Sequence, residues 1–200
     1  MIRKEARSRV PIHELIARRW SPRAFDPDRN LTKVQLLALS EAARWAPSCF
    51  GDQPWRFVFC DRTADQPLWE SVLSCLTEKN RRWACNAPVL ICAAAAEQFS
   101  QNEKANRWAQ YDTGAASENI CLQATALGLV AHQMGGFDAA AVREVLGVPS
   151  GFVPMAVIAV GYQGNSDHLH PDFHAAETGP RHRDELGTHF FIGRWGNPIA

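Results

Sequence analysis

Hydrophobic residues recur at three- and four-residue steps in several parts of the chain, which is the pattern of an amphipathic helix. The segments that show it are residues 11–19, 31–48, 66–79, 102–127 and 138–147. The second of them opens with a capping box, in which Thr32 stands three residues before Gln35, and it must end before Pro47. We therefore predict a helix in each segment. The longest covers residues 102–127, and small residues crowd its middle, so close helix packing is expected there.

Shorter apolar runs bounded by turn residues predict strands. They lie at residues 55–60, 87–96, 128–136 and 152–162. The run at 87–96 carries no charge, which is typical of a strand buried on both faces. The polar stretch 163–191 has little periodicity, and the one element expected there is a helix that begins at Asp184 and Glu185. Helices and strands mix without clean βαβ alternation, so the pattern favours one α+β domain, residues 1–200, with a central mixed sheet.

Composition narrows the class of protein. The chain is 46% apolar, and its 21 basic and 21 acidic residues give a net charge of zero. A nucleic-acid or membrane-surface binder would show a basic excess, so neither partner is expected. The first ten residues lack the apolar core of a signal peptide, and the apolar run at 87–96 is too short to span a bilayer. The six cysteines are widely spaced, which predicts free thiols in a reducing cytoplasm.

Several catalytic and cofactor motifs are missing from the sequence. It contains no GxGxxG, no GxxxxGK[ST], no GxSxG and no HExxH, so a Rossmann site, a P-loop, a nucleophile elbow and a zincin site are not expected. His168, His170 and His174 are closely spaced, but no helix or strand is predicted to hold them. A solvated loop is the better interpretation of these histidines, and no metal site is predicted.

Cationic residues that suit a phosphate occur at both ends of the chain. Arg19, Ser21 and Arg23 form an N-terminal cluster, and Arg181 with Arg183 forms a C-terminal pair. Side chains two apart in extended chain point the same way, so each set repels itself unless an anion lies between its members. No acidic residue is expected to neutralise either set. Taken alone, the C-terminal pair is better explained as a solvated charge run.

Five stretches occur in the order and spacing of one enzyme family. They are "RRWSPRAF", "APSCFGDQPWRF", "NRRWACNAPVLI", "ALGLVAHQMGGFD" and "ETGPRHRDEL". Together they resemble the FMN-dependent nitroreductase family, over nearly the whole chain from about residue 12 to about residue 186. The resemblance implies a nitroreductase-like fold: a largely antiparallel sheet flanked by helices, with a long central helix at a homodimer interface.

The resemblance also implies which residues contact FMN. The N-terminal cluster would bind the cofactor with Trp20 between its members, and Arg23 would face the pyrimidine edge of the isoalloxazine. The C-terminal pair would hold the phosphate. Asn80 would touch the ribityl chain or the ring edge. A loop would reach across the dimer interface to the partner's flavin, through Pro47, Ser48 and Cys49. A turn would lie near flavin N5, formed by Met134, Gly135 and Gly136.

Two positions depart from the family pattern. Gly51 stands where many relatives carry Asn, and Trp83 stands where some carry Lys. The predicted activity is hydride transfer from NADH or NADPH through FMN to a nitroaromatic, quinone, enone or flavin acceptor. Both substrates would use the same flavin face in turn, and no side chain is assigned a catalytic role. The alternatives are a branch of the family that fragments its flavin or dehalogenates an aromatic, and a non-catalytic FMN-binding or delivery protein.

Overall fold

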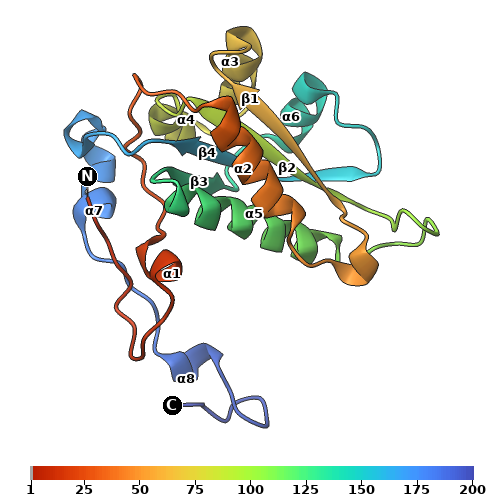
Figure 1. Ribbon diagram of the computed structural model, residues 1–200, viewed down its shortest axis with the longest axis vertical. Helices are drawn as coiled ribbons and strands as arrows, with labels where there is room; N and C mark the ends of the chain where they lie inside the picture. The colour runs from red at the N-terminus through yellow and green to blue at the C-terminus, as the bar shows by residue number, and fades with distance from the viewer. Residues whose placement is uncertain (1) are drawn as a thin grey trace.

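A four-stranded sheet forms the centre of the computed structural model, which describes residues 2–200 (Figure 1). Its strands are β1 (Trp55–Asp61), β2 (Val89–Ala96), β3 (Val130–Met134) and β4 (Phe152–Gly161). They lie in the order β1-β2-β4-β3, and each neighbouring pair is antiparallel. All four strands were predicted. The sheet is antiparallel throughout these pairs, so the largely antiparallel α+β fold is confirmed.

Helices cover both faces of this sheet. The α-helices of residues 2–200 are α1 (Glu14–Arg18), α2 (Lys33–Arg44), α3 (Gln66–Ser74), α4 (Glu78–Ala84), α5 (Ala109–Ala126), α6 (Ala139–Leu146), α7 (Pro171–Thr178) and α8 (Leu186–His189). Helices α2 and α5 lie on one face, and α3, α4 and α6 lie on the other (Figure 1). The central strand β2 alternates between the two cores: Val89 and Ile91 face α2 and α5, whereas Leu90 and Cys92 face the other helices. This explains why its sequence is apolar at every position.

The predicted helix at 66–79 is wrong as a single element. It is split into α3 and α4 by an extended link, in which the Asp138 N–H donates to the Cys75 carbonyl (2.8 Å) and the Thr77 N–H donates to the Gly136 carbonyl (3.0 Å). Two backbone hydrogen bonds to the chain after β3 replace those of a continuing helix. The link sets the start of α4, and through it the position of Asn80.

The boundaries of two other predictions also differ. Helix α5 begins at Ala109 and not near residue 102, because residues 98–105 fold back on themselves with the Phe99 N–H donating to the Lys104 carbonyl (2.9 Å). The polar stretch 163–191 contains two α-helices: α8, which starts directly after Glu185 as expected, and α7, which was not predicted. Phe173 and Glu177 of α7 are both buried, one helical turn apart. An apolar stripe so short does not produce a periodic signal.

The histidines of this stretch shape its backbone, so the solvated-loop interpretation is wrong for two of them. The His170 side chain accepts from the Asp172 N–H (3.3 Å) and caps α7, and His174 Nε2 lies 2.8 Å from the Leu169 carbonyl.

All six cysteines carry free thiols, and four of them are buried. Across residues 2–200, no helix has the length and hydrophobicity that a bilayer crossing demands.

Candidate functional site

The N-terminal cluster lies on extended chain just after α1. Arg19 ends that helix, and Pro22 prevents its continuation. The Arg19 guanidinium donates to Ser21 Oγ through Nη1 (3.3 Å), and its Nε lies 3.3 Å from the Glu118 carboxylate on α5. Burial raises the pKa of Glu118, and the charge of Arg19 opposes that shift. An acid therefore does lie beside this cluster, which corrects our expectation that neither set has one.

The C-terminal pair reaches the same region. Arg181 Nη1 donates to the carbonyl of Ala17, 164 residues earlier in the chain, and to that of Lys4, both at 2.9 Å. Burial lowers the pKa of Arg181, and repulsion by Arg19 and Arg183 lowers it further. The structure therefore brings Arg19, Ser21 and Arg181 together. Arg183 is exposed at a pocket of about 440 Å³ that the N-terminal residues 6–10 share with residues 181–186.

Arg23 is held differently from Arg19. Its backbone N–H donates to the carboxylate of Glu177 on α7 (2.9 Å), and its guanidinium lies over the Phe173 ring, 5.9 Å from the ring centre. Trp20, predicted between the cationic residues, lies under the Lys4 ammonium group at 4.6 Å. Both residues therefore face segments near the chain ends in this structure.

His132 on β3 supports the backbone of the cluster. Its Nδ1 lies 3.0 Å from the Pro22 carbonyl, and its ring packs 4.5 Å from the Trp83 ring. Because the carbonyl oxygen can only accept, Nδ1 carries the proton. Burial lowers the pKa of His132 to about 4, and the charges of Arg23 and Arg19 contribute in the same direction, so the ring is neutral at pH 7.

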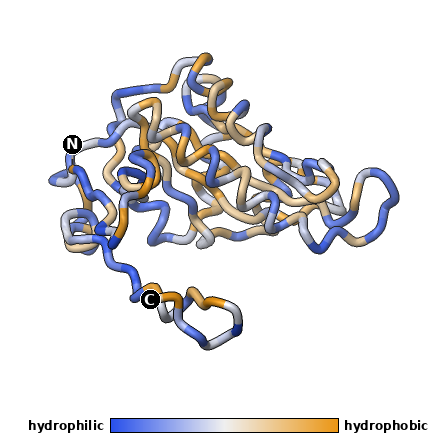
Figure 2. Tube along the Cα trace, turned by 60° about the horizontal axis from the view of Figure 1, so that its bottom comes forward, coloured by the Kyte–Doolittle hydropathy of each residue, from blue (hydrophilic) through white to orange (hydrophobic). Residues whose placement is uncertain are grey.

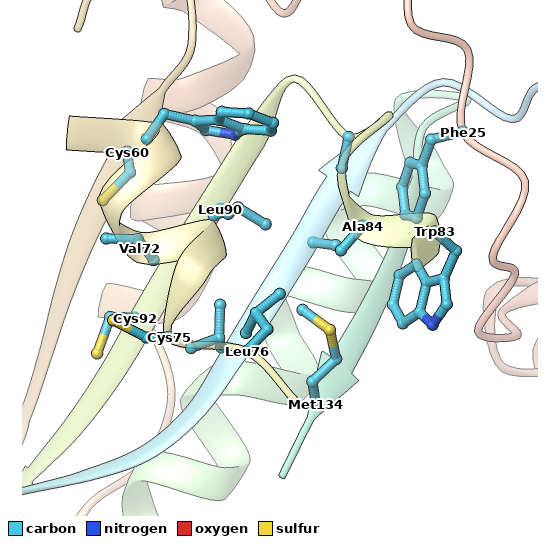
Figure 3. Close-up of a cluster of buried hydrophobic side chains, with 14 of the residues drawn as sticks. Phe25, Cys60, Val72, Cys75, Leu76, Trp83, Ala84, Leu90, Cys92 and Met134 are labelled. Carbon is cyan, nitrogen blue, oxygen red and sulfur yellow. The ribbon is translucent and has the colours of Figure 1, made fainter. Parts of the chain in front are cut away.

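Trp83 is a core residue. It is fully buried and stacks on Phe25 with 6.0 Å between ring centres, as the close-up of the core shows (Figure 3). The indole packs against His132 and Phe25, and His132 in turn contacts the backbone of the N-terminal cluster at Pro22.

Asn80 and the turn after β3 meet directly. Asn80 Nδ2 donates to the Gly136 carbonyl at 3.0 Å, beside the Thr77 N–H. A Cβ placed on Gly136 would lie 2.8 Å from Asn80 Nδ2, so glycine is required there for close approach, whereas a Cβ on Gly135 would meet open space. The Met134 side chain points into the core, so only its backbone can face a ligand at this turn (Figure 3).

The loop from Pro47 to Cys49 lies near the start of α5 (Figure 1). The Cys49 N–H donates to the buried carboxylate of Asp112 at 2.9 Å. Phe50 and Gln53 next to it have positive φ angles of 55° and 50°, a conformation that costs non-glycine residues energy. Across residues 2–200, no hydrogen bond or ion pair joins this loop to the N-terminal cluster.

Four residues near the cluster were not found from the sequence: Lys4, Glu118, His132 and Glu177. Lys4 and Glu177 lie in polar stretches, and Glu118 and His132 are single polar residues in a helix and a strand, so no local pattern marks them as neighbours of the cluster. Asp112 does give a signal in the sequence, because it interrupts the apolar stripe of its helix. The structure explains this interruption by the hydrogen bond that Asp112 accepts from the Cys49 N–H.

Comparison with known proteins agrees with this geometry. The model of the nitroreductase family matches residues 16–162. A crystal structure of an oxidoreductase containing FMN superposes with a TM-score of 0.88, at 36% identity over 96% of each chain. An uncharacterised 15.4 kDa protein of Mycolicibacterium smegmatis is 39% identical over 58% of this chain and 76% of its own. The oxygen-insensitive NAD(P)H nitroreductase of Enterobacter cloacae is 25% identical over 90% of this chain and 98% of its own. The chain therefore belongs to the nitroreductase family.

Proposed function

We propose that the chain is an FMN-dependent oxidoreductase that takes hydride from NADH or NADPH and passes it to a nitroaromatic, quinone, enone or flavin acceptor. The observation that carries the proposal is the cationic cluster built by both ends of the chain. The cluster contains five cationic residues and has two carboxylates, Glu118 and Glu177, beside it. The cationic residues are Lys4, Arg19, Arg23, Arg181 and Arg183. A relative described as an oxidoreductase containing FMN has the same fold at 36% identity.

The residues present fit FMN. Burial lowers the pKa of Arg181, and repulsion by Arg19 and Arg183 adds to that shift. A phosphate dianion would offset this repulsion, and charge-assisted hydrogen bonds from arginine are strong. The surface of Gly135 is open, so backbone can approach a flat ring there. When bound, FMN supplies the hydride-accepting centre. The chain's own groups bind and orient it, and a positive charge from Arg23 at the pyrimidine edge would favour the anionic reduced form.

We also propose a homodimer, in which the Pro47–Cys49 loop meets the partner's flavin. Phe50 beside this loop is 82% exposed, and Tyr111 and Trp45 nearby are exposed as well. The chain leads away from the body of the protein after α7, so α8 and the residues that follow it lie apart from the sheet (Figure 1 and Figure 2). Apolar residues of this segment are exposed, among them Trp195, which is 93% exposed. Exposed apolar surface of this extent is typical of a surface that another chain covers. The buried free thiols support a reducing, cytoplasmic location.

The test is reconstitution with FMN followed by anaerobic addition of NADH or NADPH. We expect the visible flavin absorption to bleach and to return intact in air. Bleaching without recovery of intact FMN would indicate a flavin-fragmenting enzyme, and binding without bleaching would indicate a delivery protein. A protein that cannot bind FMN would contradict the proposal.

Steady-state kinetics test the shared site. Since both substrates would use one flavin face in turn, double-reciprocal plots at several acceptor concentrations should be parallel. Converging lines would indicate a ternary complex and a separate nucleotide site.

A further inference from the structure

Glu177 is a fully buried carboxylate in a segment without an evident role. It lies on α7 with 0% of its surface exposed. Its Oε2 accepts from the Arg23 N–H at 2.9 Å, and its Oε1 accepts from the Ala24 N–H at 3.1 Å. Burying a carboxylate is costly unless it is hydrogen-bonded, and here both oxygens bind successive backbone groups more than 150 residues earlier in the chain.

The backbone that Glu177 holds lies outside the regular helices and strands. Residues 21–24 obtain their hydrogen bonds from distant parts of the chain. The Pro22 carbonyl accepts from His132 on β3 (3.0 Å), and the Ala24 carbonyl accepts from the Gly164 N–H (2.8 Å). Glu177 supplies the acceptors for the two N–H groups. The conformation of this segment is therefore set by tertiary contacts, and Glu177 provides two of them.

The surroundings of α7 reinforce the same placement. Lys4 Nζ donates to the carbonyls of Ala176 (2.7 Å) and Glu177 (3.2 Å). Burial lowers the pKa of Lys4, and the charge of Glu177 opposes that shift. Phe173 lies one helical turn before Glu177, and the Arg23 guanidinium lies over its ring. The helix thus contacts both the backbone and the side chain of Arg23.

We infer that Glu177 is a positioning residue of the flavin site: its two hydrogen bonds fix the backbone at Arg23 and so aim the Arg23 guanidinium at the flavin ring. This inference rests on the proposed function for the part that concerns flavin. A simpler role for Glu177 would be to anchor α7 to the protein. That role would not require both carboxylate oxygens to bind the backbone of Arg23, a member of the N-terminal cluster, and of its neighbour Ala24.

The matched variants are Glu177→Gln and Asp172→Asn. Glutamine keeps the size of Glu177, but its NH₂ group replaces one of the two accepting oxygens. Because NH₂ is a donor, it cannot accept from the backbone N–H group that it would face, and one hydrogen bond is lost. Asp172 lies on the same helix and pairs with Arg82 (3.1 Å) and His170 (3.3 Å), and within residues 2–200 its side chain makes no hydrogen bond to residues 21–24. Asp172→Asn therefore loosens the start of the helix and leaves the two hydrogen bonds of Glu177 in place. Hydrogen exchange is read in the flavin-free protein, so this arm does not depend on the proposed function.

In the wild type, the Arg23 and Ala24 amides should be strongly protected. In Glu177→Gln they should exchange about tenfold faster or more, and FMN should bind about tenfold more weakly, as expected for the loss of one hydrogen bond to a charged group. Asp172→Asn should change neither. Unprotected amides in the wild type, or equal exchange in the two variants, would overturn the inference whether or not a variant folds poorly.

The midpoint potential of bound flavin separates positioning from anchoring. Glu177→Gln should shift this potential, and the same substitution in an Arg23→Ala background should leave it unchanged, since the two residues act in series. An equal shift in both backgrounds would contradict action through Arg23. If the wild type binds no flavin, the proposed function fails, while the exchange experiment still tests the hydrogen bonds of Glu177.

Discussion

The Nε of Arg19, at the end of α1, lies 3.3 Å from the carboxylate of Glu118 in the middle of α5. This ion pair holds the guanidinium beside Ser21 in the absence of an anion. A bound phosphate would share that guanidinium with Glu118, so the two negative groups would oppose each other. The pair is partly exposed, which limits its strength to about 1 kcal/mol or less.

Arg19→Ala and Glu118→Gln should therefore act in opposite directions on FMN binding. Loss of Arg19 removes a charge-assisted bond and should weaken binding by about ten- to a hundredfold. Loss of the Glu118 charge should strengthen it by up to about fivefold. Titration followed by flavin fluorescence measures both. Riboflavin, which has no phosphate, is the control ligand, and an equal effect of Arg19→Ala on both ligands would contradict a phosphate contact.

The two glycines after β3 should respond differently to alanine. Gly136→Ala places a Cβ 2.8 Å from Asn80 Nδ2, so Asn80 must move and lose its hydrogen bond, at a cost of about 1 kcal/mol or more. Gly135→Ala meets open space in the flavin-free protein. Thermal unfolding should show a lower Tm for Gly136→Ala alone. If flavin lies against this turn, Gly135→Ala should weaken FMN binding without changing the Tm, and unchanged binding would place the ring elsewhere.

Acid should destabilise the protein through His132. Burial lowers the pKa of His132 to about 4 in the folded state, while an unfolded chain protonates near pH 6.5. Between these values the unfolded state binds more protons, so this contribution to stability is complete above about pH 7 and falls as the pH drops toward 4. The slope is at most about 1.4 kcal/mol per pH unit.

Chemical denaturation at several pH values measures this slope. His132→Asn offers a donor near the position of Nδ1 but does not titrate, so it should unfold with a shallower pH dependence in that window. An unchanged slope would show that other groups dominate acid unfolding.

Cysteine labelling tests the proposed dimer site. Burial raises the pKa of Cys60 to about 11 and that of Cys92 to about 12, so their reactive thiolate forms are scarce at neutral pH. Cys49 and Cys85 are half-buried, and burial raises the pKa of Cys85, so Cys49 should react first with iodoacetamide, as read by peptide mass spectrometry. In the proposed dimer, FMN should slow this reaction, and Cys49→Ser should remove it. A monomer in sedimentation that still binds FMN tightly would contradict the shared site.

The strands and the family could be predicted because their signals are local. The uncharged run of β2 and the glycine pair after β3 can each be recognised from a few consecutive residues. Helix α4 could not be separated from α3, since the break depends on backbone pairing with residues 136–138, distant in sequence. Glu177 likewise has no local signal: its burial follows from hydrogen bonds to a segment more than 150 residues earlier.

The candidate site shows the same limit. Arg19, Ser21 and Arg181 were predicted from residue type and family spacing, and the structure brings them together. Glu118, which neutralises Arg19, is a single acidic residue among small residues in the middle of its helix, so its role depends on packing that no local pattern encodes. The FMN contacts of the individual residues stay predictions that the variants above address.

The closure of the N-terminal cluster by α7 has a consequence for the order of assembly during synthesis. Residues 17–24 leave the ribosome long before their partners at 164, 177 and 181. A nascent chain that has completed β4 holds strands β1 to β4 and still lacks the acceptors that fix the backbone of Arg23. The cationic cluster can therefore be completed only after α7 has been made, so a chain cut short near residue 165 would retain these strands yet present no finished cationic cluster.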